Sequence, residues 1–83
     1  MQYIDDVRMI LKDVLALGDR AFELKENSAL IGSIPELDSM AVINVLTALE
    51  AHFGITFEDD EISASTFETL GSLVQFVEHK LSE

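Results

Sequence analysis

The sequence predicts an all-α fold: a small helical bundle of three main helices plus a short fourth helical turn, with a long loop between the first and second helices. Two observations carry this prediction. Apolar residues recur at helical spacing in three separate stretches of the 83-residue chain, and turn-forming residues separate these stretches. A chain of this length supports one small domain, so we expect residues 1–83 to form a single domain.

The first helix is expected over residues 4–17, where apolar residues recur every three or four positions and charged residues fill the other side. Asp5 and Asp6 lie in its first turn, where the positive end of the helix dipole favours anions. Gly18 is the predicted stop. Residues 19–37 show no sustained period, but their apolar side chains predict a long loop that is anchored to the core.

The second helix is expected over residues 39–53, with Gly54 as the left-handed residue that ends it. Its apolar stripe is predicted to comprise Met40, Val42, Ile43, Val45, Leu46, Leu49 and Phe53. Small or weakly polar residues such as Ala41 and Asn44 are left on the remaining surface.

The short fourth helical turn is predicted at residues 58–62. The last helix is expected to begin at a capping box, with Ser65 as the cap and Glu68 as the residue that reaches back to it. Apolar residues then follow at alternating steps of three and four as far as Leu81. Gly71 within this helix costs about 1 kcal/mol relative to Ala, and we predict that close packing against a neighbouring helix requires it.

The charge balance excludes several classes of partner. Five Lys and Arg stand against 16 Asp and Glu, and the formal net charge is −11. A nucleic-acid-binding protein needs a basic face, and an anionic membrane surface would repel this chain. Between Lys25 and Lys80 the sequence holds ten acidic residues and no Lys or Arg. This run is either a solvated face or a docking surface for basic proteins.

The sequence offers few residues for chemistry of its own. His52 and His79 lie far apart and belong to no spaced set of metal ligands. The acidic run of residues 58–61 lacks the pattern of a calcium loop, and no Cys is present. We therefore expect neither a metal site nor an enzyme. The chain also shows no secretory signal and no apolar run of roughly 18 residues, so a cytoplasmic protein without a membrane span is expected.

The segment Asp38-Ser39-Met40 lies where the long loop meets the second helix. Such a pair of residues most often only caps a helix, which is worth about 1 kcal/mol. A serine at this point, however, lies beside unpaired backbone amides and the positive end of the helix dipole, which together stabilise an attached phosphate. Glu36 and Asp38 would attract a basic modifying enzyme. The position therefore suits a phosphate-linked group.

Along its whole length the sequence resembles the acyl carrier protein family. The segments that carry the resemblance are Leu30-Ile31, then Glu36-Leu37-Asp38-Ser39-Met40 (with Met for Leu in the family's Asp-Ser-Leu attachment motif), then Ala48 to Ile55, and finally Ile62 to Phe67 followed by Thr69-Leu70 and Leu73. The resemblance implies a single carrier domain. It also implies that Ser39, flanked by Asp38 and Met40, receives 4′-phosphopantetheine from coenzyme A through a separate magnesium-dependent phosphopantetheinyl transferase. The cofactor thiol then carries acyl groups as thioesters.

The resemblance also implies the partners, which are acyl-activating and acyl-transferring enzymes with basic docking surfaces. The residues expected to face them are Glu36, Asn44, Glu50, Asp59 and Asp60. We expect a monomer that binds neither nucleic acid nor membranes.

Some residues depart from the family pattern. Ala41, Asn44, Ala51 and His52 stand where acyl carrier proteins commonly have acids. We therefore expect a specialised pathway rather than bulk fatty acid synthesis. Residues 32–41 also resemble carriers of bacterial exosortase and exopolysaccharide systems.

Alternatives remain beside the acyl carrier. One is a D-alanyl, other aminoacyl or peptidyl carrier, although Asp rather than His before the serine favours acyl cargo. Another is an acidic helical interaction module that is never modified. For an aliphatic cargo, four residues either fill the core or line a sheltering space: Ile43, Leu46, Ile62 and Leu70.

Overall fold

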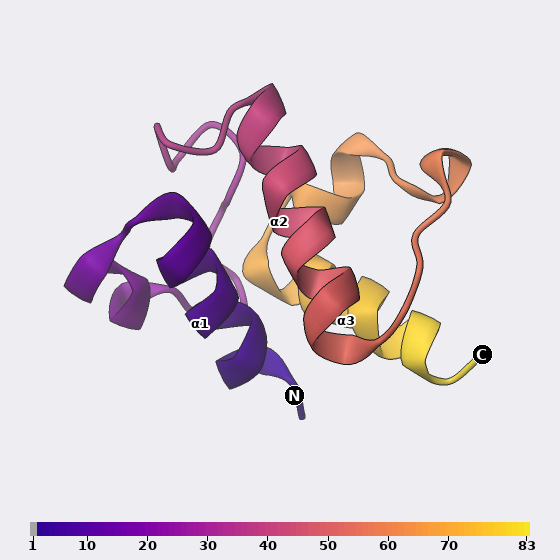
Figure 1. Ribbon diagram of the computed structural model, residues 1–83. Coiled ribbons are helices and arrows are strands. Elements are labelled where there is room, and N and C mark those ends of the chain that lie inside the picture. The colour runs from indigo at the N-terminus through magenta and orange to yellow at the C-terminus, as the bar shows by residue number, and fades with distance from the viewer. Residues whose placement is uncertain (1) are drawn as a thin grey trace.

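Three helices make up the bundle in a computed structural model that describes residues 2–83; Met1 lies outside the described residues. They are α1 (Ile4–Leu15), α2 (Ser39–Phe53) and α3 (Leu70–Leu81), and α1 packs against both of the others (Figure 1). Three short 3-10 helices lie in the connections: η1 (Gly18–Glu23), η2 (Asp59–Glu61) and η3 (Ala64–Phe67). The predicted all-α bundle is confirmed, and η2 is the predicted fourth turn.

Each main helix buries one apolar stripe in a shared core. The buried residues are Val7, Leu11 and Leu15 of α1, Ala41, Val45 and Leu49 of α2, and Leu70, Leu73, Val74 and Val77 of α3. The long loop adds Leu30, Ile34 and Leu37, all of them buried. The loop is thus anchored to the core as predicted, and its path to α2 is fixed by packing.

The buried stripe of α2 differs from the predicted one. Ala41 is buried, whereas Met40 and Ile43 are 65% and 55% exposed. The prediction was wrong for these three residues because the stripe runs through Ala41, Val45 and Leu49 at steps of four, on the side where α1 packs. Two large apolar side chains therefore lie on the surface near the start of α2.

The predicted ends of α1 and α3 need correction. Helix α1 ends at Leu15 because Ala16 takes the left-handed conformation (φ 54°), and its amide donates to the carbonyl of Lys12. Gly18 begins η1 instead. Helix α3 begins at Leu70, not at a cap on Ser65.

A different capping box starts α3. The amide of Ser72 donates to the hydroxyl of Thr69 at 3.0 Å, and the amide of Thr69 donates back to the hydroxyl of Ser72 at 3.0 Å. A similar pair, Ser63 and Thr66, starts η3. At the start of each of these helices, two hydroxyl residues form the reciprocal hydrogen bonds that were predicted for Ser65 and Glu68.

The long loop is hydrogen-bonded to the start of α3. Ala29 and Thr69 form an isolated antiparallel bridge, and the amide of Leu70 donates to the carbonyl of Ser28 at 3.0 Å. Gly71 lies so close to this loop that an added Cβ would be 2.8 Å from both the carbonyl oxygen and Cγ of Glu26. Close packing at Gly71 is therefore confirmed, but its neighbour is the loop and not a helix.

Candidate functional site

Asp38 is the N-cap of α2 and leaves Ser39 as the first helical residue. The backbone of Asp38 is extended, and its carboxylate Oδ1 accepts a hydrogen bond from the amide of Ala41 at 2.9 Å. Its carbonyl oxygen accepts from the amide of Val42, also at 2.9 Å. These two bonds fix the direction in which the helix starts and therefore where the Ser39 side chain lies.

The start of α2 presents its side chains to solvent. Asp38, Ser39 and Met40 are all exposed. The helix supplies no acceptor for its first amides, which include those of Ser39 and Met40, and the positive end of the helix dipole lies there as well. An accessible hydroxyl beside free amides can carry a phosphate ester, whose charge the amides and the dipole would stabilise.

Buried apolar side chains hold the turn that leads into the site. Ile34 and Leu37 are buried on either side of Pro35, and the amide of Leu37 donates to the carbonyl of Ile34 at 3.0 Å. Between them, the carboxylate of Glu36 accepts a hydrogen bond from the guanidinium of Arg20 in η1. This bond is the main reason why the pKa of Glu36 lies below its ordinary value. The carboxylate thus ties the turn to η1.

The residues expected to face partners fall into two groups. Asn44, Asp59 and Asp60 are exposed. Glu36 is paired with Arg20, and Glu50 accepts a hydrogen bond from the amide of Phe57 at 2.8 Å. The last two carboxylates therefore have structural partners within the chain, which the sequence pattern did not reveal.

A cavity of about 250 Å³ lies between α2 and the segment that follows it. Its apolar lining consists of Ile43, Leu46, Phe57 and Ile62, and its polar lining of Thr47, Glu50 and Asp59. Three of the four residues named as candidate lining residues thus contribute to it. The fourth, Leu70, is fully buried in the core of the bundle.

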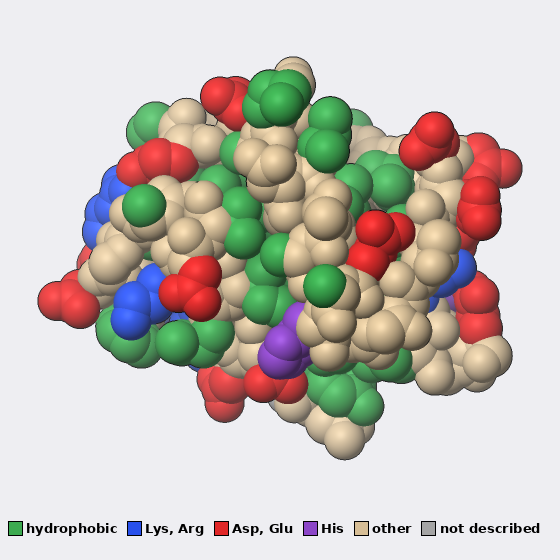
Figure 2. Space-filling model, viewed as in Figure 1, with side chains coloured by type: hydrophobic (Ala, Val, Ile, Leu, Met, Phe, Trp, Pro, Cys, Tyr) green, Lys and Arg blue, Asp and Glu red, His purple; other side chains and the backbone are tan. Residues whose placement is uncertain are grey.

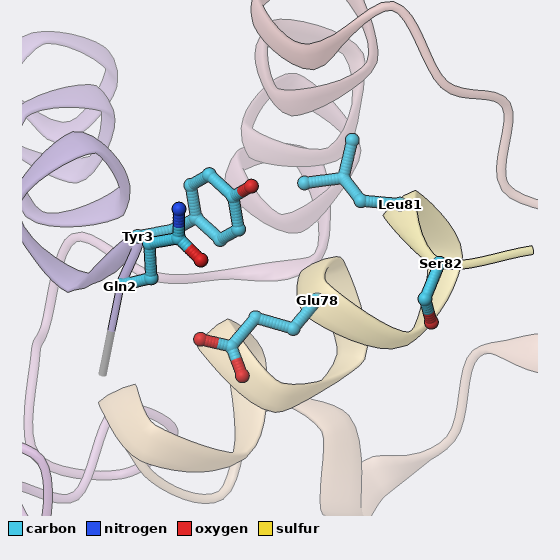
Figure 3. A pocket seen from close by; sticks show the side chains of 5 residues that line it. All are labelled: Gln2, Tyr3, Glu78, Leu81 and Ser82. Atoms are coloured by element: carbon cyan, nitrogen blue, oxygen red, sulfur yellow. The ribbon is translucent and has the colours of Figure 1, made fainter.

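A second hollow, of about 480 Å³, lies between the start of α1 and the end of α3. Figure 3 shows the ring of Tyr3 and the side chain of Leu81 on opposite sides of it, with Glu78 near its edge. Tyr3 packs edge-on against Phe53 at the end of α2. The hollow therefore lies near the C-terminal end of α2, whereas Ser39 lies at the N-terminal end of that helix.

Charge is distributed unevenly over the surface. Figure 2 shows acidic side chains over the segment between α2 and α3, and apolar side chains at the N-terminal end of α2. In the part of the chain that the structure describes, no group of three or more His, Asp or Glu side chains could hold a metal ion. None of the helices within residues 2–83 is long and apolar enough to cross a membrane.

Comparisons with known proteins identify the family. A family model described as the phosphopantetheine attachment site matches residues 5–77. The holo acyl carrier protein of Nitrosomonas europaea, solved by NMR in solution, is 64% identical over 100% of both chains, with a TM-score of 0.94. A search of the curated proteins gave no match. The fold and the matched domain define a carrier of covalently attached 4′-phosphopantetheine and not an enzyme. The chain belongs to the acyl carrier protein family.

Proposed function

We propose that the hydroxyl of Ser39 is the attachment point of 4′-phosphopantetheine. The thiol at the end of this cofactor would then carry acyl groups as thioesters. One observation carries the proposal: within the matched region, Ser39 is an exposed serine at the first position of a capped helix. The amides at this helix start and the dipole would stabilise the phosphodiester.

In the attachment step the oxygen of Ser39 forms a bond to the phosphorus that bears pantetheine in coenzyme A. The bond from that phosphorus to the adenosine bisphosphate breaks, and the serine proton leaves. A separate phosphopantetheinyl transferase with magnesium would supply the base and the charge neutralisation. This chain contributes the accessible oxygen and, through Asp38 and Met40, the surface on either side of it.

Mass spectrometry after incubation with coenzyme A, magnesium and a promiscuous phosphopantetheinyl transferase tests the proposal. The expected result is a gain of one phosphopantetheine, which Ser39→Ala abolishes. Ser33→Ala removes an exposed hydroxyl from the loop that precedes α2 and is expected to load normally. Loading of the Ser39→Ala protein would show that the attachment point lies elsewhere. Failure of the unaltered protein to load would favour the unmodified interaction module.

We further propose that the carrier serves a specialised pathway. Of the four residues that replace family acids, Asn44, Ala51 and His52 are exposed, whereas Ala41 is buried and does not belong to the surface. Partner enzymes would therefore meet a nearly neutral face on α2. Ordinary fatty acid synthase enzymes are expected to use the acylated protein slowly; rapid and complete use would contradict specialisation. An activating enzyme that loads amino acids instead of fatty acids would identify an aminoacyl carrier.

Electrostatic docking is proposed at the exposed residues Asn44, Asp59 and Asp60. Glu36 and Glu50 add negative charge, although each carboxylate also has a partner within the chain. The double substitution Asp59→Asn/Asp60→Asn is expected to weaken binding of the transferase and to reduce its salt dependence, since exposed charges are screened beyond about 10 Å at 0.1 M salt. Asp6→Asn/Asp13→Asn makes the same charge change on exposed positions of α1. Equal effects of the two double substitutions would point to net charge and not to a docking site.

The remaining proposals concern the setting of the protein. We propose a cytoplasmic bacterial protein that acts as a monomer and folds as one carrier domain. The bacterial origin of the similar acyl carrier protein supports this setting. Sedimentation at increasing protein concentration tests the monomer.

A further inference from the structure

Lys80, near the end of α3, is the one Lys or Arg that follows Lys25 in the sequence. Its side chain is only 10% exposed, although it carries a charge. The ammonium lies 3.0 Å from both carboxylate oxygens of Glu61 and 3.2 Å from Oε1 of Glu83. Loss of the Glu61 carboxylate would leave this ammonium with the carboxylate of Glu83.

The carboxylate of Glu61 closes η2 as well as binding Lys80. Its Oε1 accepts a hydrogen bond from the amide of Glu58 at 3.0 Å. The neighbouring residues Asp59 and Ile62 line the 250 Å³ cavity beside α2. The ion pair therefore connects α3 directly to the outer wall of that cavity.

The outer wall, which we call the strap, comprises residues 57–62 and is held at both ends. At its start, Glu50 of α2 accepts a hydrogen bond from the amide of Phe57 at 2.8 Å, and the Phe57 ring stacks on Phe76 of α3 at 4.9 Å. At its other end, Lys80 holds Glu61. The first attachment uses the backbone and a buried ring. At the second, Ile62 packs against the core and the Lys80 side chain supplies the charged contact. The Lys80 contact is the one that a single substitution can release.

We propose that Lys80 and Glu61 form a latch on the strap, and that the latch sets how well the cavity shelters an aliphatic chain carried by the protein. The inference rests on the proposed function at Ser39. The cavity is smaller than the roughly 300–1,000 Å³ of typical small-molecule sites, so it suits a short aliphatic chain. Such a chain is shielded only while the strap stays closed over the cavity, and the Lys80–Glu61 pair resists outward movement of the strap. Both are positioning residues, which act through the strap and not on the thioester.

The latch can be tested by comparing two thioesters on the holo-protein. The protein is loaded with an acetyl or an octanoyl group, and cleavage by hydroxylamine is followed by mass spectrometry. In the unaltered protein the octanoyl group is expected to be cleaved several-fold more slowly than the acetyl group. Lys80→Met keeps an unbranched apolar side chain but removes the ammonium, and is expected to bring the two rates close together by accelerating octanoyl cleavage alone. Lys80→Arg keeps the positive charge and is expected to keep the difference between the two cleavage rates.

Arg8→Met is the matched control, because Arg8 is 19% exposed and pairs with Asp5 at 2.6 Å on α1. It is expected to leave the ratio of the two rates unchanged. An unchanged ratio in Lys80→Met, or an equal change in Arg8→Met, would overturn the latch. If Lys80→Met does not fold, Glu61→Gln replaces it.

Hydrogen exchange on the apo-protein tests the latch without any cargo. Lys80→Met is expected to accelerate exchange of the strap amides several-fold relative to those of α1. The latch is wrong if the strap amides keep their protection. A protein that never takes up phosphopantetheine but shows faster strap exchange would contradict the proposed function and leave the latch in place.

Discussion

The carbonyl oxygen of Glu26 accepts a hydrogen bond of 2.7 Å from the amide of Gly71. This bond joins the long loop to the first turn of α3 at a point where no side chain fits between them. An added Cβ on Gly71 would lie 2.8 Å from the same carbonyl oxygen. The glycine is therefore a requirement of the join between loop and helix.

Gly71→Ala is expected to destabilise the protein. Overpacking costs about 1–3 kcal/mol, which exceeds the roughly 1 kcal/mol that Ala otherwise gains over Gly in a helix, and the backbone of Glu26 cannot move without breaking its bond. Each kcal/mol lost should lower the melting temperature by about 4–8 °C in a chain of this size. Gln75→Ala, at an exposed position of α3, serves as the control and is expected to change little. A Gly71→Ala protein at least as stable as the parent would refute the close approach.

Asp38→Ala is expected to cost about 1 kcal/mol of stability, because the amide of Ala41 loses its acceptor. Asp38→Asn keeps an acceptor oxygen and should lose much less. Urea unfolding followed by circular dichroism measures both. Equal losses in the two variants would mean that the charge of Asp38, and not its hydrogen bond, stabilises the start of α2.

The Lys80–Glu61 pair gives stability a defined pH dependence. A hydrogen bond from the amide of Glu58, followed by the Lys80 ammonium, lowers the pKa of Glu61 from its ordinary 4.5. The Glu61 carboxylate in turn is the main reason why the pKa of Lys80 is raised above 10.5. The contribution of Glu61 is complete above its unfolded pKa and is lost as the pH falls through its lowered value. That of Lys80 is complete below its unfolded pKa and is lost as the pH rises through its raised value.

Glu61→Gln should therefore melt at a lower temperature than the parent at neutral pH, and the two melting curves should converge in acid. Thermal melts from about pH 7 down to about pH 3 measure the difference. Taking the difference removes the general effect of the falling negative charge, which both proteins share. Glu23→Gln, at an exposed position of η1, makes the same change away from Lys80. If the difference in melting temperature between Glu61→Gln and the parent stays the same in acid, the Lys80–Glu61 pair does not cause that difference.

Added salt or magnesium is expected to raise the melting temperature. The net charge of −11 makes the folded chain repel itself, and counterions reduce that repulsion. Melts in increasing NaCl and, at matched ionic strength, MgCl₂ measure the effect. If the melting temperature stays constant in both salts, self-repulsion does not measurably lower the stability of the folded chain.

Local signals predicted α2 well because they lie next to the residues they act on. Asp38 caps one end, and Gly54, at φ 67°, ends the other. The end of α1 was harder to predict because Ala16, which has no special preference for the left-handed conformation, ends the helix before the more obvious Gly18. The start of α3 was misplaced because a hydroxyl at the third position replaces the Glu or Gln of the usual capping box.

The candidate site was predicted in its position but not in its internal bonds. Ser39 and its neighbours form a continuous motif, so the sequence pattern alone points to them. Glu36 and Glu50 find their partners 16 and 7 residues away, at Arg20 and Phe57. Such pairings depend on how the loops fold back, and a pattern of acidic residues cannot distinguish them from solvated charges.

The bridge between Ala29 and Thr69 joins two segments that lie far apart in the sequence. The loop that leads to Ser39 takes its final form only when the segment around Thr69 is in place to pair with it. A fragment that stops short of Thr69 would therefore lack the hydrogen bonds that hold this loop.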